Sequence, residues 1–150
     1  MEFANLQGAT ITAQSTAVFT FYDLPGEPWL RVKPGGDINR PYFAEVLASS
    51  SKQRRRLMKG KVDAEMLDQN RQLDRKLYPK HIDGGDMGGW DQMLKGKRVP
   101  VNYSPAAFTS ICEKLPADLF DELRGFCNEP ANFRAEEEPG IDDIEETAKN

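Results

Sequence analysis

Few side chains in this 150-residue sequence are suited to catalysis or metal binding, and they lie far apart. His81 is the only histidine, and no partner motif for a nucleophilic site lies near it. The two cysteines, Cys112 and Cys127, do not have the spacing of a common metal motif, so a zinc site would lack ligands. Such a pair is more typical of reduced core residues than of a disulfide. We expect no catalytic residue, no metal and no cofactor.

The segment from Gly84 to Gly89 is rich in glycine, as phosphate-binding loops are. Such a loop also needs a lysine followed by serine or threonine where a strand leads into a helix. This segment has neither, so we interpret it as a flexible loop that leads to Trp90. Trp90 itself has two interpretations, a core residue or an anchor for a partner.

A basic run, Arg54, Arg55 and Arg56, lies near the middle of the chain. Clustered guanidinium groups bind phosphates well, which would suit nucleic acid. A solvated helix end explains the run as well, because basic side chains near a helix C-terminus complement its dipole. The net charge of −4 argues against a dedicated nucleic-acid-binding protein. Nucleic acid is therefore kept only as an alternative partner.

The composition indicates one compact domain with a heavily charged surface, since 39% of residues are hydrophobic and 29% are charged. The first residues lack the pattern of a secretory signal, and no stretch has the roughly 20 apolar residues of a membrane span. We therefore expect a soluble, cytosolic protein. Residues 52–80 hold ten basic against four acidic side chains, and residues 113–150 hold twelve acidic against four basic ones. The two regions would attract each other or face partners of opposite charge.

Residues 18–22 form a cluster rich in β-forming side chains, and residues 23–27 supply turn residues. Apolar residues with interleaved basic ones follow over residues 29–33, which predicts a β-hairpin. Helical spacing predicts helices over residues 41–58, with Asn39 in the capping position, and 62–78, with Pro79 ending the second. Residues 83–103 are expected to be irregular, with a turn near Lys95-Gly96 and an extended segment at Val99-Pro100.

Two more helices are expected in the last third of the chain. Ser104 and Pro105 predict the start of the first, because serine caps a helix and proline suits its first position. Pro116 should end that helix and start the next, which runs to Pro130. Phe133 is expected to pack back onto the pair.

The sequence thus predicts an α+β fold, a mainly helical single domain of about four helices with an N-terminal β-hairpin. This domain should span residues 17–134. Residues 1–16 are expected to be a flexible N-terminal arm, and residues 135–150 an acidic, disordered tail.

Short motifs follow one another through the second half of the chain: Leu77-Tyr78-Pro79-Lys80-His81-Ile82, Gly89-Trp90-Asp91, Lys97-Arg98-Val99-Pro100-Val101-Asn102-Tyr103-Ser104-Pro105 and Asn132-Phe133. Their order, together with the hairpin over residues 19–33, resembles the tail assembly chaperones of long-tailed bacteriophages. The resemblance covers about residues 17–134. Residues 83–88 depart from the family pattern and look like an insertion, where a shorter link is expected.

The resemblance implies a non-enzymatic protein that coats the tape measure protein and keeps it soluble until the tail tube polymerises around it. A tape measure exposes apolar helix surface, so its chaperone needs apolar grooves with charged rims. The expected partner-binding residues are Trp90, Phe108, Phe120 and Phe126, with charge from Arg54, Arg55 and Arg56.

The resemblance also suggests further partners. Many family members produce a longer form by ribosomal frameshifting, so that form, the tail tube protein and further copies of the chain are candidates. The expected location is the host cell cytoplasm, with no membrane association and no place in the mature virion. The alternatives are a phage-encoded nucleic-acid-binding or host-regulatory protein and a minor structural tail component.

Overall fold

The computed structural model describes the backbone of residues 1–58 and 64–135, and the side chains of residues 1–49 and 64–134. Within these residues, five α-helices and five β-strands form a single domain, which confirms the predicted α+β class. Residues 1–16 contain a short 3₁₀ helix, η1 (Ala4–Leu6), and most of their side chains are exposed. The tail predicted for residues 135–150 falls almost entirely, from residue 136 on, outside the described residues.

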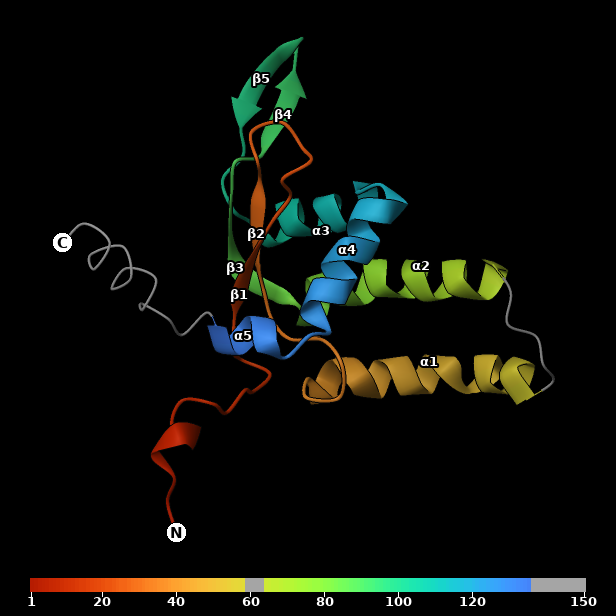
Figure 1. Cartoon of the computed structure of the whole chain (residues 1–150). Helices are drawn as coiled ribbons and strands as arrows, with labels where there is room; N and C mark the ends of the chain where they lie inside the picture. Colours follow the sequence, from red (N-terminus) through yellow and green to blue (C-terminus); the bar gives the residue numbers. More distant parts are fainter. Residues whose placement is uncertain (59–63, 136–150) are drawn as a thin grey trace.

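The helices gather on one side of a three-stranded sheet (Figure 1). They are α1 (Arg40–Met58), α2 (Ala64–His81), α3 (Pro105–Lys114), α4 (Ala117–Cys127) and α5 (Ala131–Ala135). The predicted starts of α3 and α4 are confirmed: Ser104 Oγ accepts a hydrogen bond from Ala107 N–H at 3.0 Å, and α4 begins directly after Pro116. The short α5 was not predicted as a helix. It holds Phe133 against Phe126, as expected, with ring centroids 6.0 Å apart.

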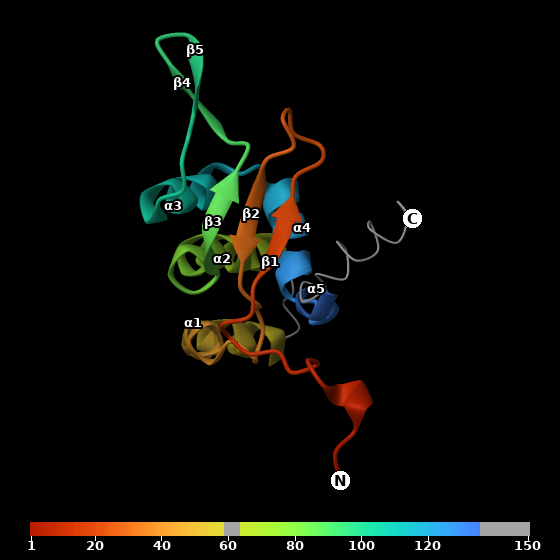
Figure 2. The same ribbon diagram turned by 90° about the vertical axis from the view of Figure 1, so that its left-hand side faces the viewer.

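The sheet contains the predicted hairpin as its first two strands. β1 (Ala17–Thr20) pairs antiparallel with β2 (Trp29–Val32), and Phe19 lies opposite Leu30. The third strand, β3 (Asp83–Gly88), pairs with the other side of β2, so the strand order is β1-β2-β3. Figure 2 shows the three strands side by side in front of the helices. Leu30 and Val32 face this helical layer and are fully buried.

The glycine-rich segment is thus a strand, and the prediction of a flexible loop was wrong. Two of its glycines permit a close approach to β2. A Cβ added at Gly84 would lie 2.6 Å from the carbonyl oxygen of Arg31, and one added at Gly88 would lie 2.6 Å from the Trp29 ring. Met87 between them is buried. Glycine is needed here because a neighbouring strand and its side chains approach the backbone, not because the segment is a loop.

α2 does not end at Pro79, as the sequence predicted, but continues to His81. Proline in a helix removes one backbone N–H donor. In the last turn this loss is small, since the hydrogen bond from Ile82 N–H to Tyr78 O forms at 2.9 Å despite the proline.

One buried side chain, Asn39, joins three segments. Its amide nitrogen donates to Pro34 O, after β2, and to His81 O, at the end of α2, both at 3.0 Å. Its side-chain oxygen accepts from Tyr42 N–H at 3.4 Å, which caps the start of α1 as predicted. The beginning of α1 and the end of α2 are therefore held by the same residue.

A second hairpin extends beyond the body of the protein (Figures 1 and 2). It consists of β4 (Asp91–Leu94) and β5 (Lys97–Pro100), where the sequence suggested irregular chain. The predicted turn is present: Lys95 and Gly96 both have positive φ, 51° and 77°, as a tight two-residue hairpin turn requires. Every residue of β4 is exposed.

The core lies between the first sheet and helices α2, α3 and α4, and includes the fully buried Tyr78, Phe108, Phe120 and Leu123. Cys112 and Cys127 are buried, free thiols in this core, as the sequence predicted. Of the helices that the structure describes, none has the length and apolar character to cross a membrane.

Candidate functional site

The structure separates the aromatic residues expected to bind a partner into two groups. Phe108 and Phe120 have no exposed surface, so in this structure their rings are core residues closed to a partner. Phe126 and Trp90 are only half-buried and line surface hollows. The side chains of the basic run Arg54, Arg55 and Arg56 lie outside the described residues.

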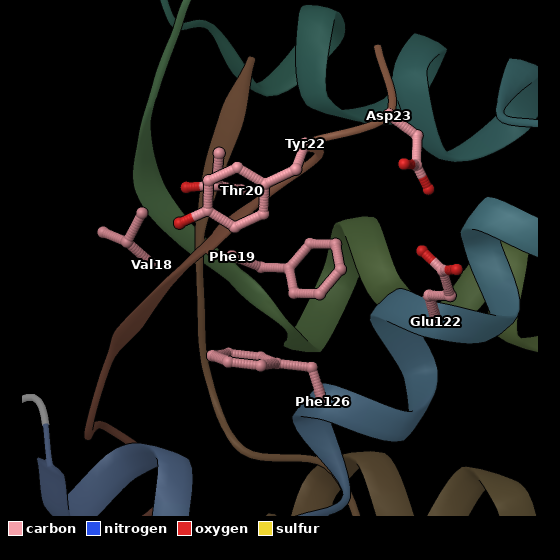
Figure 3. A pocket seen from close by; sticks show the side chains of 7 residues that line it. All are labelled: Val18, Phe19, Thr20, Tyr22, Asp23, Glu122 and Phe126. Atoms are coloured by element: carbon pink, nitrogen blue, oxygen red, sulfur yellow. The ribbon is translucent and has the colours of Figure 1, made fainter. Parts of the chain in front are cut away.

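Phe126 lines a groove of about 490 Å³ between β1 and α4 (Figure 3). We call this hollow the edge groove, because it follows the outer edge of β1. Its lining residues come from β1, the turn after it and α4: Val18, Phe19, Thr20, Tyr22, Asp23, Glu122 and Phe126.

Two aromatic rings in edge-to-face contact form the floor of the edge groove. Phe19 and Phe126 meet edge to face, with centroids 5.1 Å apart. Phe19 also contacts Phe21 at 4.8 Å, and Phe126 contacts the buried Phe133 at 6.0 Å. Such aromatic pairs prefer these tilted geometries, so the floor is a fixed apolar surface continuous with the core.

The rim of the groove includes main-chain groups of an outer strand. Phe21 N–H donates to Pro28 O at 2.8 Å, which makes positions 17, 19 and 21 the ones that bond to β2. Because an antiparallel strand alternates, the N–H and C=O groups of Val18 and Thr20 face away from β2. No strand pairs with this edge of β1 in the part of the chain that the structure describes.

One end of the edge groove is acidic. The carboxylates of Asp23 and Glu122 face each other across it (Figure 3), and both side chains are exposed. Tyr22 lies at the same end with 76% of its surface exposed. The groove thus offers an apolar floor, outward main-chain groups that no strand of the described residues pairs with, and a negatively charged end.

A buried polar cluster positions α4, which carries Phe126 and Glu122. Asp74 of α2 accepts hydrogen bonds from Tyr42 Oη and from Arg124 Nε, each at 2.7 Å. Burial, together with the adjacent Asp74 carboxylate, raises the pKa of Tyr42. The tyrosine is therefore a neutral donor to Asp74, and α1, α2 and α4 are joined through one carboxylate.

The cluster continues to the surface through Asp121. Arg71 donates to both of its oxygens, at 3.0 and 2.8 Å, and Arg124 donates to one at 3.0 Å. Hydrogen bonding by Arg71, followed by Arg124, holds the pKa of Asp121 below its ordinary value. The sequence did not indicate this cluster, because Asp74 and Arg124 are 50 residues apart and no local pattern connects them.

Trp90 lies at a second hollow of about 560 Å³, between α3 and the base of the second hairpin. Its Nε1 donates to Trp29 O at 2.9 Å, and its ring meets Phe21 with centroids 5.6 Å apart. The side chain is both packed against the core and partly exposed. Trp90 therefore agrees in part with both interpretations, a core residue and an anchor for a partner.

The groups considered for catalysis serve other roles. Burial raises the pKa of the Cys112 thiol to about 12 and also raises that of Cys127, so both thiols are protonated and poor nucleophiles at neutral pH. His81 Nε2 hydrogen-bonds to the Glu45 carboxylate, and this bond holds the pKa of Glu45 below its ordinary value. Across the described ranges, no three His, Cys, Asp or Glu side chains gather as metal ligands would.

Comparison of the chain with family models, with curated proteins and with solved structures finds no match. Function is therefore inferred from the edge groove and from the order of the sequence motifs.

Proposed function

We propose that this protein is a non-enzymatic phage tail assembly chaperone that binds the tape measure protein and keeps it soluble during tail tube assembly. The observation that carries the proposal is the edge groove, an aromatic surface with a charged end that lies open on the outside of the domain. The order of motifs between residues 77 and 133 supports the same client.

The size of the groove suits a chaperone that must later release its client. A groove of about 490 Å³ accommodates only a few apolar side chains. At about 25 cal/mol per Å² of buried apolar surface, such a contact contributes a few kcal/mol. A single contact is then weak and reversible, whereas many copies bound along one long client hold it firmly. Self-association along the client is part of this proposal.

The proposal extends to the other expected partners and to location. A longer, frameshifted form of the chain would bind the client through the same domain and recruit the tail tube protein. The protein would act in the host cell cytoplasm and leave before the virion is complete. Mass spectrometry of finished virions tests this point, because a minor structural tail component would be present there and a chaperone would be absent.

The main experiment is co-expression with the tape measure protein of the same phage. We expect the soluble fraction of the tape measure to rise severalfold when this protein is present. Tyr22→Glu adds a charge at an exposed position in the edge groove and should reduce the rise. Gln7→Glu, the same charge on the exposed arm, is the matched control and should not.

A tape measure that stays equally insoluble with and without the protein would show that the proposed function is wrong. Equal loss of activity in Tyr22→Glu and Gln7→Glu would instead remove the edge groove from the proposal.

A further inference from the structure

The two outer strands of the first sheet differ in what their edges offer. β3 carries Asp83 and Asp86, and Asp83 accepts a hydrogen bond from Tyr103 Oη at 2.7 Å. Charges of this kind protect an edge strand from pairing with another chain. The sequence of β1, Ala-Val-Phe-Thr, has no charge, no proline and no glycine. Its outer edge, which pairs with no strand in residues 1–58 and 64–135, opens directly into the edge groove.

We propose that the edge groove binds an extended segment of a partner protein, which adds to β1 as a fourth strand of the sheet. An apolar side chain of that segment packs on Phe126, and a lysine or arginine side chain lies between Asp23 and Glu122. The inference rests on the proposed function only for the identity of the partner. It replaces the docking of a helix surface, which the resemblance implies, with the binding of an extended segment of that partner.

The lining of the groove favours a strand over a helix. It includes Val18 and Thr20, which point to one face of the sheet, and Phe19, which points to the other. The groove therefore wraps the strand edge instead of lying on one face. An added strand would pair with the outward N–H and C=O groups of Val18 and Thr20. A bound helix has no main-chain groups left to pair with them.

The acidic end selects the charge of the occupant. The Asp23 and Glu122 carboxylates converge at the Tyr22 end of β1 (Figure 3). A lysine or arginine placed there would form ion pairs with both carboxylates, whereas an acidic residue would be repelled by them. Since the groove floor is aromatic, the expected segment combines an apolar residue with a nearby cation.

The experiment uses the full chain, labelled with ¹⁵N, and synthetic probes. The strand probe is a peptide of about ten residues that alternates valine and threonine and carries two lysines at one end. Main-chain hydrogen bonds supply most of the affinity in strand addition, so an unspecialised sequence suffices. Three matched probes are the same peptide N-methylated along its strand, the same peptide with glutamates for lysines, and an amphipathic helical peptide of equal charge.

We expect the strand probe to slow hydrogen exchange at the Val18 and Thr20 amides and the other probes to bind about tenfold more weakly. Thr20→Pro removes one outward N–H without touching the ladder to β2, and should also weaken binding about tenfold. Asp23→Lys combined with Glu122→Lys should reverse the preference between the lysine and glutamate probes. The NMR spectrum of each variant shows whether it remains folded.

Tighter binding of the helical probe, or unchanged exchange at Val18 and Thr20 when the strand probe saturates the protein, would overturn the inference. So would concentration-dependent protection of these amides in the protein alone. That result would assign the edge to a second copy, whose second hairpin offers Lys95, Lys97 and Arg98 as the cations.

The two proposals can fail separately. If the tape measure is solubilised and the strand probe does not bind, the mode of binding is wrong and the chaperone function stands. If the strand probe binds at β1 and the tape measure stays insoluble, the edge is a binding site for another partner.

Discussion

The two hairpins of this protein share a local form but differ in their surroundings. The first, β1–β2, has a third strand on one side and helices behind it, and Leu30 in its centre is fully buried. The second, β4–β5, extends into solvent, where Met93 and Leu94 are 65% and 49% exposed. A two-stranded hairpin is marginally stable alone in water. A favourable turn is enough to form the second hairpin, whereas burial against helices determines how much a hairpin contributes to the stability of the fold.

The difference also separates two kinds of surface. The edge groove is built on the first hairpin. Its floor is held in place because Phe19 and Phe126 pack against rings of the core. The exposed apolar residues of the second hairpin rest on a ladder of only two strands. Local opening is easiest where few buried contacts hold a segment. A site that must keep its geometry is therefore better placed on the first hairpin.

The largest difference between the two hairpins is expected when one buried leucine and one exposed leucine are each shortened. Leu30→Ala leaves a cavity in the first sheet, and we expect the free energy of unfolding to fall by about 3 kcal/mol. Leu94→Ala on the second hairpin is the matched control and should change it by less than about 0.5 kcal/mol. Urea unfolding measures both, and equal losses would mean that the second hairpin is packed in solution.

A smaller effect is expected from the glycine that brings the third strand against the first hairpin. A Cβ at Gly88 would lie 2.6 Å from the Trp29 ring, so Gly88→Ala should reduce the free energy of unfolding by about 1–3 kcal/mol. Gly125→Ala, in α4 with open space around it, should instead increase stability by about 0.5–1 kcal/mol. Thermal unfolding of the two variants gives the signs, and a stable Gly88→Ala protein would show that β3 can move away.

The smallest effect concerns the polar cluster that holds α4 beside the first hairpin. The pKa of Asp121 lies below its ordinary value of 3.8, mainly through hydrogen bonding by Arg71. A carboxyl with a lowered pKa contributes stability above its ordinary pKa, and this contribution is lost as the pH falls through the folded value. Asp121→Asn should therefore cost less than about 1 kcal/mol at neutral pH, because the Arg71–Asp121 pair is still partly open to solvent.

As the pH falls below 3.8 and through the lower pKa of Asp121 in the folded protein, the stability difference between the variant and the parent protein should disappear. Unfolding in urea at several pH values checks this, and a difference that persists in acid would point to a packing role for Asp121. Asp91→Asn, which removes the ion pair with Arg98 on the second hairpin, is the control and should change stability by less than about 0.5 kcal/mol.

The sequence predicted the elements whose signals are local. The first hairpin, the caps at Ser104 and Asn39, the break at Pro116 and the return of Phe133 all depend on residues a few positions apart. β3 was missed because its glycines have no strand signal of their own. The need for glycine at these positions becomes clear only when Trp29 and Arg31 of the neighbouring strand are seen to lie against them.

The candidate site was predicted only in part, for a similar reason. Phe126 was identified from helical spacing, but its neighbour in the groove, Phe19, lies near the other end of the chain. No local pattern showed that β1 would be an outer strand, because strand order depends on where β3 inserts. Phe108 and Phe120 belong to apolar helical patterns, as Phe126 does. Only the packing of the helices decides that these two are fully buried and Phe126 is not.

The bridging role of Asn39 has a consequence for how the chain folds. Its amide needs two acceptors, and one of them, His81 O, lies 42 residues further along the chain. While α2 is undocked, the amide N–H that bonds to His81 O lacks this acceptor, and the link between the start of α1 and the end of α2 is not yet formed. We expect α1 to be set in place late in folding, together with the arrival of α2. A chain emerging from the ribosome would then complete the start of its first long helix only after the whole of the second has been synthesised.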